Sequence, residues 1–235
     1  AGTLGDIGSY SLNYHKHIHT GEGGILVTND DDIAERIRLI RNHAEAVVGE
    51  KGVTDLRNMI GYNFRLGEME CAIGIEQLKK LDRLLVSRQH AAERLTRGLM
   101  HLPGLRIPVV LSECTHSYYM YPMTLDVELL GVSRASICEA LEAEGLPSLA
   151  SAYQNLHLLP MYQKKIAYGS SGFPWSSDIC HREVDYSKGI CPVAESLNDT
   201  KYIGIEMCVH ELSDEDVDLI VHAFAKVWKG MGDLR

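Results

Sequence analysis

The pattern of apolar and polar positions predicts two strands and a helix over the first part of the chain. Residues 7–13 alternate well enough to predict a short strand, and residues 23–30 form a glycine-led apolar run that ends in an Asn-Asp turn signal. Apolar residues at helical spacing follow over 31–44, behind acidic residues in the first turn of that segment. The polar and irregular stretch 45–62 indicates loops.

Helical spacing of apolar positions returns over 67–100, a segment longer than one ordinary helix. We interpret it as a single helix or as two helices with a break near residues 85–87. A helical segment of this length is typical of a link between domains. We therefore predict a domain boundary that separates residues 1–86 from residues 87–235.

Beyond the long helical segment the pattern predicts a second α/β unit. Residues 116–126 predict a strand, and residues 133–146 predict a helix with a serine N-cap and a glycine stop. The stretch 147–190 is rich in Pro, Gly, Ser and Tyr, which favours loops. Residues 191–207 indicate a short helix followed by a strand, and residues 212–231 predict a closing amphipathic helix.

Composition narrows the class of protein. The 235 residues, 45% hydrophobic and 23% charged, are an ordinary globular mixture for one large domain or two modest ones. A net charge of -9 argues against a nucleic-acid partner, which usually requires a basic surface. No apolar run is long enough for a membrane span, and no segment resembles a signal peptide. Six cysteines at irregular spacing favour free thiols, so we expect a cytoplasmic protein without membrane or nucleic-acid partners.

Lys16 is the residue with the most distinctive candidate chemistry. It lies just past the first predicted strand in "SYSLNYHKHIHTGEGG", a segment poor in other charges. A lysine is nucleophilic only when neutral, and a neutral lysine forms Schiff bases with carbonyl groups. Ser11 is of a type that binds phosphate near a strand end, and the glycines at 21–24 predict a tight turn. The residues alone leave open that Lys16 is a solvated lysine beside that turn.

Two groups of residue types leave metal binding open, although we expect no metal. The histidines His15, His17 and His19 would share one face of a strand, which suggests a metal site. Pocket lining is the simpler interpretation, because histidine both hydrogen-bonds and transfers protons near neutral pH. A zinc site is also conceivable, but structural zinc sites usually pair their ligands at short spacing. Its ligands would come from Cys180, His181, Cys191, Cys208 and His210.

The stretch "GYNFRLGEMECAIGIEQLKKLD" at 61–82 opens a helix behind an aromatic-flanked asparagine. Asn63 and Arg65 are suited to an anion near a helix N-terminus, and the alternative is a cap beside a surface arginine. Together with S-x4-K and GEGG, this stretch resembles the DegT/DnrJ/EryC1/StrS family of sugar aminotransferases dependent on pyridoxal phosphate (PLP). The stretches "HSYYMYPMTLD" and "YQNLHLLPMY" also fit the family, so the resemblance spans essentially the whole chain.

The resemblance implies an α/β fold of the fold type I (aspartate aminotransferase) superfamily. Residues 1–86 would form the C-terminal part of the large PLP-binding domain, and residues 87–235 would form the small C-terminal domain. By the same resemblance, Lys16 is the Schiff-base lysine, and Ser11 contacts the cofactor phosphate. Asn63 would reach the cofactor of a neighbouring subunit, which implies a homodimer with shared active sites.

The resemblance also implies a reaction. Lys16 stands where sugar dehydratases of the family carry histidine, which favours amino transfer, with glutamate as the expected donor and a keto sugar as the acceptor. That sugar would be nucleotide-linked or a sugar acid. A dehydratase of the same family and a non-catalytic regulatory relative remain the alternatives. Glu22 in the GEGG turn is expected to be structural.

Substrate contacts are expected from residues near the lysine and in the second half of the chain. The candidates are His15, His17, Arg65 and His157, with Tyr153 and the 170–190 loop beside the last of these. The family's aspartate for the pyridine nitrogen and its aromatic residue that stacks on the ring have no counterpart in residues 1–10. We therefore expect them in a segment upstream of this chain, and we expect these 235 residues alone to bind PLP poorly.

Overall fold

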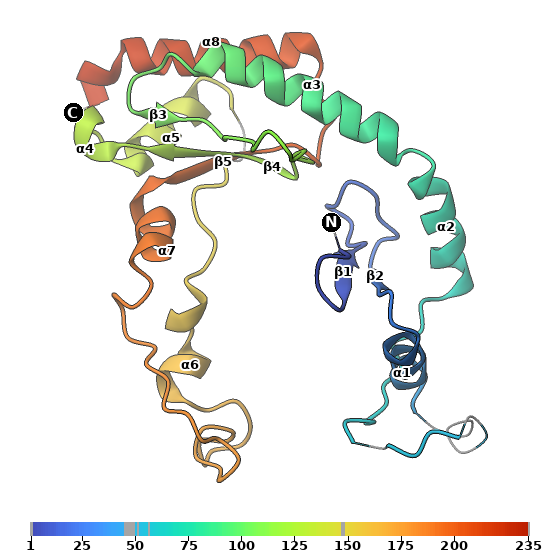
Figure 1. Ribbon diagram of the computed structural model, residues 1–235. Coiled ribbons are helices and arrows are strands. Elements are labelled where there is room, and N and C mark those ends of the chain that lie inside the picture. Colours follow the sequence, from blue (N-terminus) through green and yellow to red (C-terminus); the bar gives the residue numbers. More distant parts are fainter. Residues whose placement is uncertain (1, 45–49, 51, 56, 147–148, 235) are drawn as a thin grey trace. The chain divides into compact units, whose positions relative to one another are not determined.

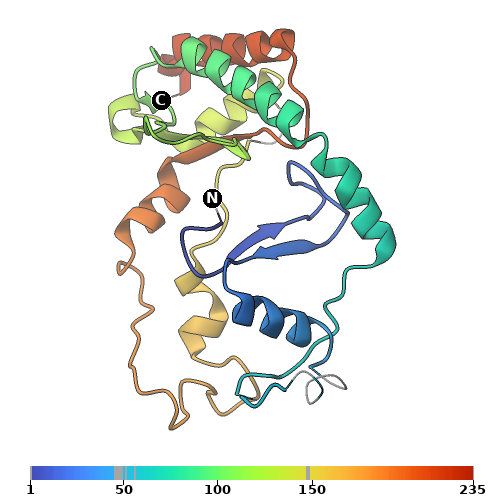
Figure 2. The ribbon, with the colours of Figure 1, turned by 45° about the vertical axis from the view of Figure 1, so that its right-hand side comes forward.

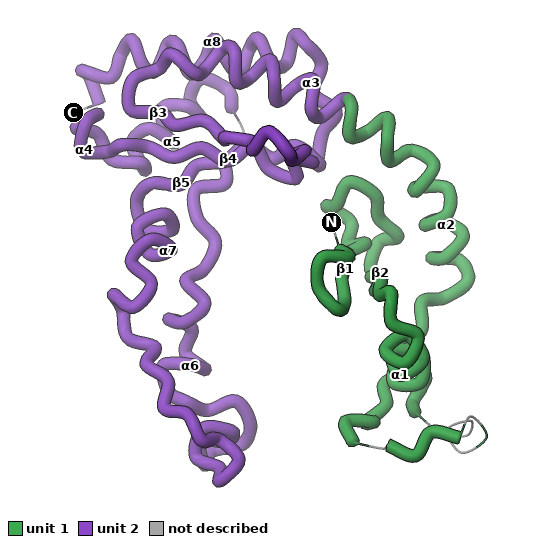
Figure 3. The backbone as a smooth tube through the Cα atoms, in the orientation of Figure 1, with its two compact units in different colours: residues 1–86 green, residues 87–235 purple. Residues whose placement is uncertain are grey.

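The computed structural model describes residues 2–44, 50, 52–55, 57–146 and 149–234. The chain forms two compact units, residues 1–86 and residues 87–235 (Figure 3). Each unit combines helices with an antiparallel sheet (Figure 1). Within the described residues, no helix is both long enough and apolar enough to cross a bilayer.

The first unit is built on a two-stranded ribbon of β1 (Gly8–Ser11) and β2 (Gly24–Val27). Ser11 pairs with Gly24, so the segment with Lys16 leaves one strand and returns directly into its partner. Helix α1 (Asp31–Arg41) follows β2, and the Asp30 carboxylate caps it by accepting a hydrogen bond from the Ile33 N–H at 3.0 Å.

Two helices occupy the long helical segment: α2 (Glu68–Leu78) and α3 (Leu81–Leu99). The break lies at Lys79 and Lys80, so the alternative of a break near 85–87 is wrong. Residues 85–87 include neither glycine nor proline, and nothing there interrupts the helical hydrogen bonds. The turn separates two helices that differ in burial. Helix α2 buries none of its side chains, whereas α3 contributes buried side chains to the core of the second unit.

The second unit contains a three-stranded antiparallel sheet in the order β3-β4-β5. Alternate residues of the central strand are buried, so one face of the sheet carries the core. Helices α3 and α8 run along the sheet, as Figures 1 and 2 both show, and α5 packs against α8. The sheet consists of β3 (Leu105–Arg106), β4 (Met120–Leu125) and β5 (Tyr202–Glu206). Besides α3, the long helices of this unit are α5 (Arg134–Ala143) and α8 (Asp214–Lys229).

The predicted serine N-caps of two helices in the second unit are confirmed. Ser133 caps α5, and Ser213 forms a capping box with Asp216 at the start of α8. Between β4 and β5, the stretch 147–190 is mostly loop as predicted, although Pro147 and Ser148 lie outside the described residues. The short elements of the unit are α4 (Val127–Leu130), η1 (Leu156–Leu158), α6 (Pro160–Lys164), α7 (Pro192–Ser196), η2 (Leu197–Lys201) and η3 (Met231–Leu234).

Candidate active site

The segment between β1 and β2, residues 12–23, is a closed loop that we call the lysine loop. Two backbone hydrogen bonds close its base, from Leu12 N to Gly23 O at 2.9 Å and from Thr20 N to Leu12 O at 3.0 Å. Leu12 and Thr20 are both buried, so the base of the loop is anchored by packing as well. The loop therefore presents Lys16 from a fixed base instead of from an open turn.

Asn13 and Glu22 connect the two legs of the lysine loop. The Asn13 amide donates to Glu22 Oε1 at 2.7 Å, and the Thr20 hydroxyl donates to the Glu22 carbonyl at 2.7 Å. The Asn13 carbonyl accepts from the Lys16 N–H at 3.0 Å, which turns the chain immediately before the lysine. The sequence analysis missed Asn13, and the signal that marks it is the tendency of asparagine to bond to nearby backbone groups.

Glycine is required at the end of the lysine loop by close packing. Gly23 has a φ of +154°, and a Cβ atom there would lie 2.8 Å from Thr20 Oγ1 and 3.1 Å from Leu66 Cδ1. A Cβ atom at Gly74 of α2 would likewise lie 3.3 Å from the Thr20 methyl group. The GEGG turn is thus where the lysine loop packs against the 61–82 stretch.

The side chains at the tip of the lysine loop are half-buried. Lys16, His15 and His17 all keep part of their surface exposed, and the His15 ring meets Tyr14 edge-on at 5.0 Å. These residues follow the end of β1, so the expectation that the histidines share one face of a strand is wrong. The physical reason is the Asn13 turn, which breaks the alternation of a strand.

His19 carries an unusual nitrogen. Its Nδ1 is buried and is the one such side-chain atom without a hydrogen-bond partner among the described residues. Burying a polar atom without a partner costs free energy. The lysine loop therefore offers a polar contact that its own residues leave unfilled.

Ser11 and Asn63 are the two other residues predicted to contact the cofactor. Ser11 Oγ accepts from the Asn13 N–H at 3.2 Å, so the hydroxyl keeps its own hydrogen to donate. The backbone of Asn63 pairs with Asn42, and its side chain is exposed. Arg65 Nη1 donates to Asn42 Oδ1 at 2.8 Å, so this guanidinium is partly committed to holding the segment.

His157 belongs to the second unit and is mostly buried there. Its Nε2 lies 2.9 Å from Glu195 Oε1, and the two side chains retain 12% and 8% of their surface. Tyr153 is exposed, and its backbone N–H donates to Asn198 Oδ1 at 3.0 Å.

The metal alternatives and a further cavity complete the description. Within the described ranges, the structure brings together no three His, Cys, Asp or Glu side chains able to hold a metal ion. A cavity of about 680 Å³ opens in the second unit between the loop after β5 and helix α8. Its lining includes Leu146, Ile220 and His210, and none of the residues predicted to bind the cofactor or the substrate is among the lining residues.

Comparison with known proteins identifies the class. The fold matches that of the aminotransferase TlmJ from Streptoalloteichus hindustanus, with a TM-score of 0.71 and 28% identity over 100% of this chain and 54% of that one. The predicted α/β aminotransferase fold is thereby confirmed. Residues 1–187 match the model of the DegT/DnrJ/EryC1/StrS aminotransferase family, and the chain belongs to that family.

Two curated relatives carry informative names. The GDP-perosamine synthase of Caulobacter vibrioides is 32% identical over 69% of this chain and 42% of its own length. The L-glutamine:2-deoxy-scyllo-inosose aminotransferase of Streptoalloteichus tenebrarius is 29% identical over 100% of this chain and 56% of its own length. The chain spans about half the length of the curated relatives it matches.

Proposed function

We propose that this chain supplies the lysine-bearing part of a PLP-dependent aminotransferase site that transfers an amino group to a keto sugar. The observation that carries the proposal is the closed lysine loop between β1 and β2. This loop holds Lys16 at its tip and keeps the Ser11 hydroxyl at its entrance, in the order that the family resemblance requires. Family membership supports the reaction class.

The residues present fit the cofactor. Lys16 offers a primary amine for an aldehyde, Ser11 offers a hydroxyl for a phosphate oxygen, and the buried Nδ1 of His19 is a polar atom without a partner in the described structure. When bound, pyridoxal phosphate supplies the aldehyde that receives the amino group and an electron sink for the substrate carbon. The Nζ atom of Lys16 would bind the cofactor at rest, and during transfer it would carry the proton to and from the substrate carbon.

The acceptor is proposed to be a sugar ketone, in line with the sugar and cyclitol substrates in the names of the two relatives. Glutamate is the proposed donor. The name of the scyllo-inosose relative specifies L-glutamine, so the two donors need direct comparison. His15, His17, Arg65 and His157 are the proposed contacts to substrate.

We further propose a homodimer in which Asn63 reaches the partner's cofactor. The Asn63 side chain is exposed, and its exposed neighbours Tyr62 and Phe64 stack at 4.8 Å into an apolar surface of the first unit. The segment is held in place by hydrogen bonds from His43 N to Tyr62 O and from Phe64 N to Arg41 O. A fixed segment with exposed polar and aromatic side chains suits a subunit contact.

Lys16→Ala tests the proposal, and Lys80→Ala is the matched control because Lys80 is an exposed lysine outside the lysine loop. In the protein that carries this chain together with the expected upstream segment, we expect Lys16→Ala to abolish amino transfer from ¹⁵N-labelled glutamate or glutamine to a panel of keto sugars, and Lys80→Ala to retain it. Release of 2-oxo acid from the donor separates amino transfer from dehydration. Wild-type transfer rates in Lys16→Ala would refute the assignment.

A further inference from the structure

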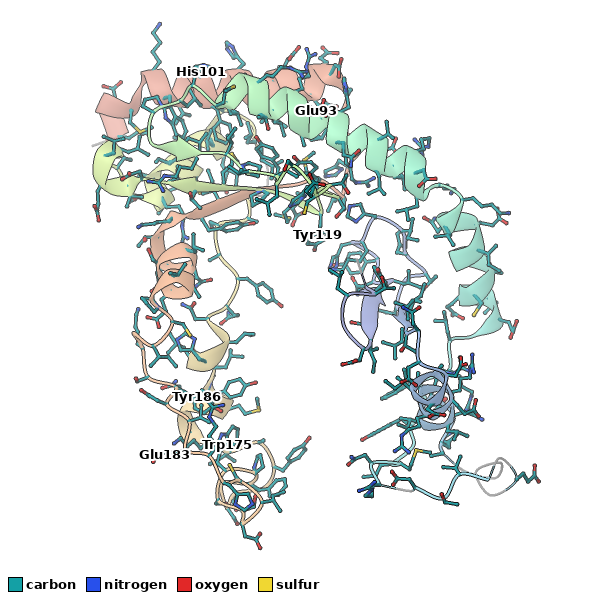
Figure 4. All side chains as sticks on the ribbon, in the orientation of Figure 1. Glu93, His101, Tyr119, Trp175, Glu183 and Tyr186 are labelled. Carbon is teal, nitrogen blue, oxygen red and sulfur yellow. The ribbon has the colours of Figure 1, made fainter. Side chains whose placement is uncertain are left out.

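Between α5 and β5, residues 151–191 form a long extension of the second unit that we call the arm (Figure 2). Its two legs descend from the sheet; the first includes α6, and α7 follows directly after the second. Gln163 cross-links the legs by donating to the carbonyls of His157 at 2.7 Å and Tyr186 at 2.6 Å. At the far end, Trp175 donates to the Tyr186 hydroxyl at 3.1 Å (Figure 4).

One short segment holds the root of the arm. Asp199 accepts from Asn155 Nδ2 at 3.1 Å on one leg and from Lys188 Nζ at 2.9 Å on the other. Glu195, in α7, likewise connects the His157 ring on one leg with backbone N–H groups on the other. The arm is therefore fixed at its root by two carboxylates with similar roles.

The Glu195 carboxylate is ionised and acts only as an acceptor. The Gly189 N–H lies 2.8 and 2.9 Å from its two oxygens, and the Cys191 N–H lies 3.2 Å from Oε1. These backbone bonds, that from Gly189 first, and the His157 bond lower the pKa of Glu195 in spite of its burial.

An acceptor-only carboxylate fixes the protonation pattern of the His157 ring. Nε2 must donate to Glu195 Oε1, so in the neutral ring Nε2 carries the hydrogen and Nδ1 is an acceptor. His157 Nδ1 makes no hydrogen bond within the described structure. It is also not one of the fully buried atoms that lack a hydrogen-bond partner there, so it retains some exposure to solvent. The side chain keeps 12% of its surface, so a ligand can approach this nitrogen.

We propose that Glu195 is a positioning residue that holds His157 in one tautomer, with Nδ1 offered as an acceptor to a hydroxyl group of the sugar substrate. The inference rests on the proposed function for the identity of the ligand, and on the geometry alone for the tautomer. It resembles the carboxylate–histidine pairs that orient imidazole rings elsewhere in proteins. A ring polyol is the class of ligand that Nδ1 would bind.

The test compares Glu195→Gln with Asp199→Asn, which alters the other carboxylate at the root and leaves His157 untouched. Two-bond ¹H–¹⁵N spectra show which ring nitrogen carries the hydrogen. In the wild type and in Asp199→Asn, we expect hydrogen on Nε2 only, and we expect added myo-inositol to shift the His157 Nδ1 resonance. In Glu195→Gln, we expect a mixture of tautomers and binding of the polyol weakened about tenfold, because one hydrogen bond is lost.

Two outcomes would overturn the proposal, and neither depends on how Glu195→Gln folds. One is a wild-type ring with its hydrogen on Nδ1. The other is a His157 Nδ1 resonance that does not move with myo-inositol. The proposed function fails separately, since loss of the Lys16 assignment would leave both spectra unchanged.

Discussion

The two units differ most in how they bury apolar side chains. In the described part of the second unit, 24 buried residues, mostly from the sheet and from α3, α5 and α8, form one continuous cluster. Among the described residues of the first unit, the buried hydrophobic side chains are Leu12, Leu39 and Leu84. The second unit thus has a core of its own, and the first holds its shape chiefly by local hydrogen bonds.

The buried core that stabilises the fold thus lies in the second unit, whereas the proposed chemistry lies in the first. The first unit carries Lys16 on a two-stranded ribbon, an element that is marginal by itself in water. It also leaves apolar side chains of α2 uncovered, including Met69, Ile75 and Leu78, which are 77%, 61% and 58% exposed. Such a surface suits further contacts, and the subunit interface proposed for Asn63 is one candidate.

Leu95→Ala against Leu78→Ala is the sharpest test of this contrast. Leu95 is fully buried in α3, so its truncation should reduce the free energy of unfolding of the second unit by about 2–5 kcal/mol. Leu78 is exposed near the end of α2, and the same substitution there should change this free energy of unfolding by less than about 0.5 kcal/mol. Urea unfolding monitored by tryptophan fluorescence measures both, since Trp175 and Trp228 lie in the second unit. Equal effects would show that the two units share one core.

Ser213→Ala should have a smaller effect, which depends on pH. The Ser213 hydroxyl caps α8, so its loss should cost about 1 kcal/mol at pH 7. The hydrogen bond from this hydroxyl is the main cause that lowers the pKa of Asp216. A carboxyl with a lowered pKa stabilises the fold above its unfolded value, near 4, and the effect is lost as pH falls through the folded value.

The cost of Ser213→Ala should therefore shrink between pH 7 and pH 3, as measured by urea unfolding at each pH. Ser133→Ala is the control, because Ser133 caps α5 through the Ser136 N–H and has no carboxylate partner among the described residues. The loss of stability in Ser133→Ala should not change as Asp216 becomes protonated. A constant cost in Ser213→Ala would mean that the hydroxyl does not influence that carboxylate.

Local patterns predicted most of the elements. Alternation over residues 7–13 located β1, and a glycine-led apolar run located β2. Ser133 and Ser213 located the starts of two helices, because these signals act within a few residues. The break between α2 and α3 could not be placed in this way. It depends on which apolar residues enter the second core, and that is a property of packing.

The candidate site shows the same limit. Lys16, Ser11 and the GEGG turn stood out by type and spacing, but Asn13 did not, since its role depends on the position of Glu22 across the closed loop. Glu195 was missed for the same reason. Its partners His157 and Gly189 lie on two legs of the arm, and only the folded chain brings them to one carboxylate.

Asp30→Ala should give the smallest effect and is the most discriminating test for the first unit. Asp30 caps α1 as Ser213 caps α8, but α1 packs into a unit with few buried side chains. We expect the main unfolding transition to be unchanged, because it reports the core of the second unit. Hydrogen exchange of the amides in α1, residues 31–41, should become about fivefold faster, since local opening no longer has to break the cap. A shifted main transition would show that α1 unfolds together with the second unit, and the two units would then be one cooperative body.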